Sequence, residues 1–130
     1  MARVLVDTSG IYALLARDDA SHDAARSALD RLRKRRDEPI ITNFIRAECH
    51  ALLLARLGPE VAREWLSTGV WATERVTPED EDDAREIILT HVDKRYSFTD
   101  ATSIALMKRL KIRAAVAFDR HFSQFGIELA

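Results

Sequence analysis

Four acidic residues that lie far apart in the sequence have the types and positions to form one site. Asp7 ends a short apolar segment near the N-terminus, and Asp119 ends a similar segment near the C-terminus. Because the carboxyl ends of strands in an open parallel sheet meet at one edge, these two carboxylates are expected to lie together. Asp100 falls in the first turn of a helix that Ser97 or Thr99 is expected to cap.

Glu48 is the fourth acid, and its surroundings on the predicted helix are apolar. At helical spacing it shares a stripe with Phe44, Ala51, Leu52 and Ala55. A single carboxylate on such a stripe is costly to bury unless it is paired or bound to a metal. Glu48 is therefore a candidate for the same site as the three aspartates.

Each of these acids also has a simpler explanation when it is considered alone. Asp7 could cap the next helix, Asp100 could favour the positive end of a helix dipole, and Asp119 could begin a turn. Glu48 could lie at the edge of its stripe and reach water. If the four carboxylates converge, however, they repel one another and raise one another's pKa. Convergence favours a divalent cation that prefers oxygen ligands.

The residue types favour Mg²⁺, with Mn²⁺ as a substitute, over zinc. Mg²⁺ is bound by a few carboxylates together with water and phosphate oxygens. The four histidines form no closely spaced pair, and Cys49 is directly adjacent to His50 rather than separated from it by the spacing of zinc ligands. The histidines are His22, His50, His91 and His121.

We expect Asp7 and Asp100 to bind the metal directly. Glu48 and Asp119 would complete the site, either as further ligands or by orienting a metal-activated water. The hydroxyl residues next to the first acid are expected to hold a carboxylate or a phosphate oxygen by a hydrogen bond. These residues are Thr8 and Ser9.

Short apolar and β-branched segments alternate with helical patterns along the chain. Strands are predicted at 3–7, 40–42, 70–76, 114–118 and 127–129, and helices at 11–16, 22–36, 43–57, 60–68, 78–92 and 97–110. The pair Thr77 and Pro78 gives the clearest helix start, as a cap followed by a proline in the first turn. This alternation implies parallel crossovers. The sequence therefore predicts one α/β domain over residues 1–130, a three-layer α/β/α sandwich with a central, mainly parallel sheet.

Three motifs, in the order in which they occur, resemble those of the PIN-domain family. They are VLVDTSG with Asp7, SFTDA with Asp100 and VAFDRHF with Asp119, and the isolated Glu48 lies between the first two. The length of the chain is similar to that of the VapC toxin branch. The resemblance extends from Arg3 to about residue 125, and the segment around Glu48 is its least distinctive part.

The resemblance implies a PIN-like fold and a Mg²⁺-dependent endoribonuclease that is the toxin of a type II toxin–antitoxin pair. It implies cleavage that leaves a 5′-phosphate and a 3′-hydroxyl. Members of the family are often dimeric and are inhibited by a cognate antitoxin. We therefore expect an RNA substrate, an antitoxin partner, a homodimer and no association with membranes.

The composition indicates a globular domain in the cytoplasm. With 47% hydrophobic and 32% charged residues in 130, the chain can bury a core. A single cysteine cannot form an internal disulfide, and neither a signal peptide nor a membrane span is expected. Because 20 Lys and Arg face 21 Asp and Glu, RNA binding would depend on local patches or metal ions. The dense cationic run at 31–36 is interpreted as a solvated helix end, with a contact to RNA or antitoxin as the alternative.

Three other functions share some of these features. A phosphatase of the haloacid dehalogenase type also begins with a strand-end aspartate, but it requires a second one where this chain has Ser9. A receiver domain requires paired acids and a late strand-end lysine, near where Asp119 stands. A PIN-like module that binds RNA or protein without strong catalysis is the third. The presence of all four acids argues against it, and calorimetric measurement of metal binding would separate it from a nuclease.

Overall fold

A five-stranded sheet forms the centre of the computed structural model, which describes residues 2–69, 71–118 and 121–130. The strands are β1 (Arg3–Val6), β2 (Glu38–Thr42), β3 (Ala72–Glu74), β4 (Ala114–Val116) and β5 (Glu128–Leu129). Their order across the sheet is β3-β2-β1-β4-β5, and every neighbouring pair is parallel. The predicted α/β fold with a parallel central sheet is confirmed.

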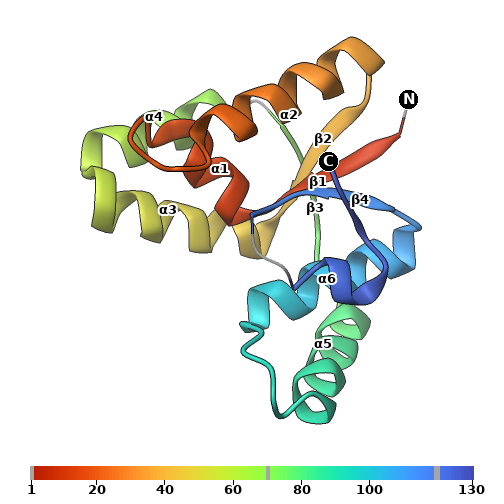
Figure 1. Ribbon diagram of the computed structural model, residues 1–130. Helices are drawn as coiled ribbons and strands as arrows, with labels where there is room; N and C mark the ends of the chain where they lie inside the picture. Colours follow the sequence, from red (N-terminus) through yellow and green to blue (C-terminus); the bar gives the residue numbers. More distant parts are fainter. Residues whose placement is uncertain (1, 70, 119–120) are drawn as a thin grey trace.

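The helices lie on both faces of this sheet. They are α1 (Thr8–Leu15), α2 (His22–Arg35), α3 (Asn43–Leu57), α4 (Pro59–Thr68), α5 (Pro78–Thr90) and α6 (Phe98–Leu110), and a short 3₁₀ helix at Ser123–Phe125 precedes β5. The first four carry the chain outward from β1 to β3, whereas α5 and α6 carry it back to β4. Because such crossovers are right-handed, α5 and α6 lie on the opposite face from the others, as Figure 1 shows. None of the described helices has the length and apolar character needed to cross a membrane.

The direction of the chain across the sheet reverses between β1, the central strand, and β4. In open parallel sheets a crevice forms at the carboxyl ends of the strands at such a point. The last residues of the two strands, Val6 and Val116, are paired in register. The backbone N–H of Asp7 continues this pairing by donating to the carbonyl oxygen of Val116 at 3.0 Å. The sheet topology therefore places Asp7 in the crevice.

Gly10 allows α1 to pack closely against the end of β4. A Cβ atom at this position would lie 2.7 Å from the carbonyl oxygen of Val116 and 3.1 Å from its Cγ1. Backbone atoms cannot yield to such a contact cheaply, so a larger residue would push α1 away from the strand. Since α1 follows Asp7 directly, Gly10 also sets the position of that carboxylate.

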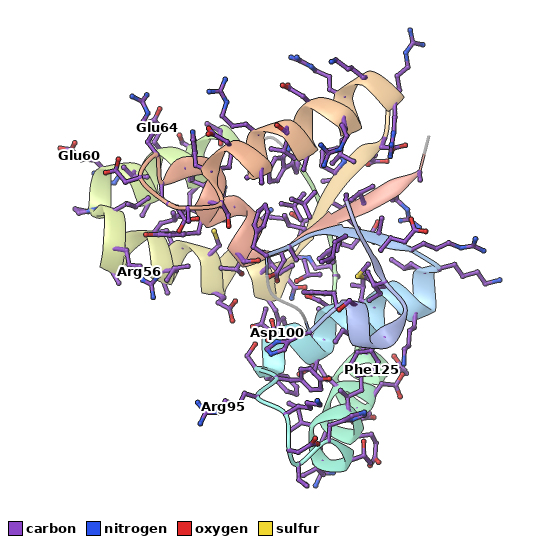
Figure 2. All side chains as sticks on the ribbon, viewed as in Figure 1. Arg56, Glu60, Glu64, Arg95, Asp100 and Phe125 are labelled. Atoms are coloured by element: carbon purple, nitrogen blue, oxygen red, sulfur yellow. The ribbon has the colours of Figure 1, made fainter. Side chains whose placement is uncertain are left out.

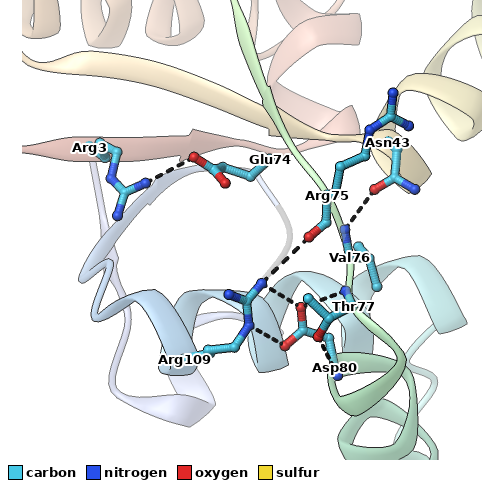
Figure 3. Close-up of polar contacts among 8 residues, drawn as sticks. All are labelled: Arg3, Asn43, Glu74, Arg75, Val76, Thr77, Asp80 and Arg109. Atoms are coloured by element: carbon cyan, nitrogen blue, oxygen red, sulfur yellow. Dashed lines mark hydrogen bonds and ion pairs between the residues drawn. The ribbon is translucent and has the colours of Figure 1, made fainter.

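A partly buried ion pair joins the end of α6 to the start of α5. Arg109 donates from Nε and Nη2 to the two carboxylate oxygens of Asp80, both at 2.9 Å (Figure 3). Asp80 also closes a capping box with Thr77 at the start of α5. Burial alone would raise the pKa of Asp80, but the bonds from Arg109 and Thr77 outweigh it and hold that pKa below its usual value. The pair thus stabilises the packing of α5 on α6.

The strand predicted at 70–76 is shorter in the structure. Its first residue, Val70, lies outside the described residues, and β3 ends at Glu74. Beyond this point the chain bonds to side chains rather than to the sheet, since the N–H of Val76 donates to Asn43 Oδ1 at 2.8 Å (Figure 3). Glu74 itself pairs with Arg3 of β1 at 3.0 Å. Side-chain contacts from other elements therefore decide where β3 ends.

Candidate metal centre

A cavity of about 440 Å³ lies in the crevice at the carboxyl ends of β1 and β4. Its lining includes Asp7, Glu48 and Asp100, which come from three separate segments of the chain. The structure therefore brings three of the four candidate acids to one place. Asp119 lies outside the residues that the structure describes.

Asp7 is held rigidly at the base of this cavity. It is 3% exposed and caps α1. Its Oδ2 accepts hydrogen bonds from the Ser9 hydroxyl at 2.9 Å and from the Ser9 backbone N–H at 3.3 Å. The Ser9 hydroxyl oxygen in turn accepts from the backbone N–H of Phe118, just beyond β4, at 3.0 Å. Ser9 thus links the carboxylate of Asp7 to the strand beside it.

The other carboxylate oxygen of Asp7 and the neighbouring Thr8 hydroxyl are buried, unsatisfied polar atoms. Asp7 Oδ1 and Thr8 Oγ1 have no hydrogen-bond partner within the described part of the chain. Buried polar atoms of folded proteins nearly always have one. Asp7 also lines the cavity together with Glu48 and Asp100, so its carboxylate is a candidate ligand for a cation.

The pKa of Asp7 also favours a cation in this cavity. Its pKa is raised from an ordinary 3.8 to about 6, first by burial and second by the charge of Asp100, although the bonds from Ser9 and Thr8 oppose the shift. The mutual repulsion inferred from the sequence is present, but burial is the larger cause. A cation at the site would compensate both effects.

Asp100 approaches the cavity from the first turn of α6. Its Oδ2 accepts from the Ser97 backbone N–H at 3.1 Å, while the Ser97 hydroxyl accepts from the Asp100 N–H at 3.0 Å. His121 Nδ1 lies 3.2 Å from the same Oδ2, and its ring meets that of Tyr96 edge-on at 4.9 Å. None of these contacts uses Asp100 Oδ1, which is left for water or a cation. Sequence reasoning missed His121, and its nearness to Asp119 is the signal that could have found it.

Glu48 reaches the cavity from a different part of α3 than expected. The helix buries Ile45, Cys49 and Leu53, whereas Ala51 and Ala55 of the predicted stripe are exposed. Glu48 is therefore half-buried at the edge of the buried face rather than within an apolar stripe. Its place at the cavity wall is consistent both with contact to water and with a role as a metal ligand.

Cys49 takes no part in this chemistry. It is fully buried, and its pKa is raised to about 12, first by burial and then by the charges of Asp7 and Glu48. A thiol with that pKa stays neutral and is a poor nucleophile or metal ligand near neutral pH.

The donor set suits a hard cation, although it is incomplete in the described residues. Within them, no three His, Cys, Asp or Glu side chains form a ready group of metal ligands. The oxygens that face the cavity are carboxylate and hydroxyl oxygens, which Mg²⁺ prefers together with water and phosphate. The unsatisfied Asp7 Oδ1 fits such an ion. The arrangement could therefore bind Mg²⁺ with few protein ligands.

Comparison with known proteins supports the same family that the motifs indicated. The PIN domain matches residues 4–128. The "23S rRNA-specific endonuclease VapC20" of Mycobacterium tuberculosis is 38% identical over 128 residues, which cover 95% of this chain and 94% of that protein. These are similarities in sequence over nearly the whole of both chains.

Solved structures agree with this. The crystal structure of M. tuberculosis VapC20, described as a sarcin–ricin loop cleaving toxin, aligns with a TM-score of 0.86 at 33% identity and covers 98% of each chain. VapBC2 from Rickettsia felis, bound to a DNA fragment from its promoter, aligns with a TM-score of 0.72 at 14% identity, covering 100% of this chain and 98% of the other. The second match shows the shared fold only. The resemblance stated from the sequence is confirmed, and the chain belongs to the PIN-domain family.

Proposed function

We propose that this protein is a Mg²⁺-dependent endoribonuclease and the toxin of a toxin–antitoxin pair, working in the cytoplasm. The observation that carries the metal requirement is Asp7, which lines one cavity with Asp100 and Glu48 and whose buried Oδ1 lacks a partner in the described residues. Two similar proteins are named as ribonucleases, VapC20 and "Ribonuclease VapC26" of M. tuberculosis, the latter 26% identical over 125 residues.

Each residue has a proposed role. Asp7 and Asp100 hold Mg²⁺, and Glu48 and Asp119 complete the site or orient water. Ser9 fixes the Asp7 carboxylate through the bonds described above, and Thr8 offers a buried hydroxyl without a described partner. Mg²⁺ held there would supply activated water and neutralise charge on the phosphate. By its family resemblance the reaction leaves a 5′-phosphate and a 3′-hydroxyl.

The purified protein should cut RNA with Mg²⁺ or Mn²⁺ and should stop cutting when EDTA is added. A fragment of 23S rRNA is the first substrate to test, since VapC20 is named for that RNA. Gel analysis should show that added Mg²⁺ restores cleavage. The variant Asp7→Asn, purified in parallel, should be inactive, which excludes a contaminating nuclease. Cleavage that persists in EDTA would contradict the proposal.

A PIN-like module that binds RNA or protein but cuts poorly is the alternative function. It predicts a different result in the same assay: RNA would be retained on the protein but would stay intact at every Mg²⁺ concentration. The raised pKa of Asp7 favours the enzyme, because a binding module gains nothing from a buried carboxylate that lacks a partner.

We further propose that an antitoxin segment binds an apolar groove beside the site. A cavity of about 600 Å³ is lined by Ile11, Leu14 and Leu15 of α1 and by Trp65 and Leu66 of α4, among others. A neighbouring face of α1, with Thr8, Ser9 and Tyr12, lines the acidic cavity. An apolar helix along α1 could therefore fill the groove while an arginine or lysine beside it pairs with the acids.

Co-expression with any small open reading frame that lies directly upstream of the gene should give a stable complex. Leu66→Asp should break it, because Leu66 lines the groove and is 46% exposed, so the change affects binding more than folding. The matched control is Leu89→Asp on α5, which is 56% exposed and outside the groove. Light scattering on the complex would also test the proposed toxin homodimer. The proposal for this groove would be overturned if the chain always purified alone, or if both variants lost the complex to the same extent.

A further inference from the structure

The acidic cavity presents a problem for a polyanionic substrate. Its described lining contains four acids, namely Asp7, Asp19, Glu48 and Asp100. Only one cation, Arg56, stands among the described residues of that lining. Even with a metal ion at the acids, RNA phosphates next to the cut would meet a negative surface. The position of Arg56 is therefore informative.

Arg56 lies at the far end of the helix wall that carries Glu48. Positions 48, 52 and 56 follow one another at four-residue spacing, so they share one face of α3, and all three residues line the cavity. Eight residues of helix place the Cα atom of Arg56 about 12 Å beyond that of Glu48 along the axis. Arg56 is thus placed to meet a phosphate that flanks the acids rather than the one at the acids.

The guanidinium is oriented by an aromatic ring and remains available. It lies over the ring of Tyr12, with 5.4 Å between Cζ and the ring centre. Tyr12 belongs to α1, is half-buried against the core and lines the same cavity. Arg56 makes no ion pair or hydrogen bond with any described residue. Stacking on an aromatic face orients the planar group while its N–H donors stay free for a phosphate.

Figure 2 shows that Arg56 extends from the side of α3 that faces Asp100, whereas Glu60 and Glu64 of α4 extend away from it. A position in the last turn of α3 also suits an arginine through the helix dipole. That explanation applies equally to Arg35 in the last turn of α2. Arg35 lines a different cavity, together with Arg3 at the opposite end of β1. Comparing substitutions of Arg56 and Arg35 therefore distinguishes a contact to RNA from a role in stabilising the helix alone.

We propose that Arg56, oriented by Tyr12, binds an RNA phosphate that flanks the cleaved bond. The inference rests on the proposed ribonuclease function. Tyr12 acts as a positioning residue, and Arg56 supplies a charge-assisted, sequence-independent contact. The contact is present in both the bound substrate and the transition state, so its loss weakens RNA binding rather than the chemical step.

The test compares Arg56→Ala with Arg35→Ala in cleavage of a 23S rRNA fragment with Mg²⁺. Arg56→Ala should raise KM about tenfold and leave kcat within about twofold, because it removes binding common to ground and transition states. Arg35→Ala should change neither constant, because Arg35 is an exposed helix-end residue that lines a cavity at the opposite end of β1. Arg56→Lys should recover part of the KM, since lysine keeps the charge but not the planar fork.

Direct binding uses a short fluorescein-labelled single-stranded RNA and the same changes in an inactive Asp7→Asn background. Arg56→Ala should weaken binding about tenfold and reduce the slope of log K against log salt by about 0.7, the value for one phosphate contact. Tyr12→Phe should keep the affinity and Tyr12→Leu should lower it. Equal losses in Arg35→Ala, or none in Arg56→Ala, would overturn the inference while cleavage by the parent upholds the ribonuclease. A parent protein that neither cuts nor binds RNA would overturn both.

Discussion

Asp7→Asn should abolish RNA cleavage and yet make the metal-free protein more stable. Cleavage activity should fall by more than about a hundredfold. Removing a group that only supports a metal ligand typically costs at most about that much, and Asp7 is proposed to bind the metal itself. The gain in stability follows from the raised pKa of Asp7, about 6 against an ordinary 3.8. A shift of this size corresponds to about 3 kcal/mol of free energy between the two protonation states. Asparagine avoids that cost and is an equally good helix cap.

The sign of the pH dependence follows from the direction of the shift. Since the folded protein binds the Asp7 proton more tightly than the unfolded chain does, the contribution of Asp7 to metal-free stability is most favourable below about pH 4 and falls until about pH 6. The advantage of Asp7→Asn should therefore be small in acid and should reach about 2–3 kcal/mol at neutral pH. Mg²⁺ should stabilise the parent by binding its folded state and should leave the variant almost unaffected.

Urea unfolding in EDTA at acidic and neutral pH, repeated with Mg²⁺, measures these differences. Asp18→Asn, an exposed acid of the following loop, is the matched control and should change neither stability nor cleavage. An Asp7→Asn protein that is less stable than the parent at neutral pH without metal, or one that still cuts RNA, would show that Asp7 is only a helix cap.

Arg109→Met should strongly destabilise the fold although it lies outside the site. Asp80 is buried, with its side chain 1% exposed, while the side chain of Arg109 is 37% exposed. Removing Arg109 leaves a buried carboxylate without its ion pair, which costs about 3–5 kcal/mol when both partners are buried. Because Arg109 is partly open to water, we expect a loss of about 3 kcal/mol, at the lower end of that range.

The companion variant Asp80→Asn separates the lost pair from the lost packing. Asparagine can still accept from the Thr77 N–H, which donates to Asp80 at 3.0 Å, so the cap of α5 survives. The double variant should therefore be more stable than Arg109→Met alone, because no unpaired charge remains. The pKa of Asp80 is held low in the parent, so the pair stabilises the fold near neutral pH and loses its effect in strong acid. Chemical denaturation of Arg109→Met near neutral pH and in strong acid tests this. If the loss of unfolding free energy were the same under both conditions, the ion pair would not be its cause.

Local signals predicted the elements that begin with strong caps. The helix expected after Thr77 and Pro78 begins at Pro78, and the one expected after Ser97 runs from Phe98 to Leu110. By contrast, α1 begins at Thr8 rather than residue 11, because Asp7 itself is the cap and Gly10 lies inside the helix. A glycine does not by itself predict the helix that contains it. The contact that requires Gly10 is with the carbonyl oxygen of Val116, which is close in space but 106 positions away in the sequence.

The sequence placed Asp7 and Asp100 well because their positions depend on where a strand ends and a helix starts. Glu48 was harder, since α3 has apolar residues on several faces and only the tertiary packing decides that Ile45, Cys49 and Leu53 are buried. Arg56 could not be found from its own segment. Its significance depends on a ring from α1, which the spacing within α3 does not reveal.

The hydrogen bond from Phe118 to the Ser9 hydroxyl, together with that from Asp7 to Val116, joins two segments that are far apart in the sequence. During synthesis β1 is made well before β4, because 109 positions separate Ser9 from Phe118. Until β4 has been made, Asp7 lacks both the neighbouring strand and the indirect support that Ser9 receives from it. The ribosome that translates this chain therefore carries no assembled site until β4 has been made. A fold that builds its acidic centre from distant segments delays the appearance of a nuclease until all of these segments exist.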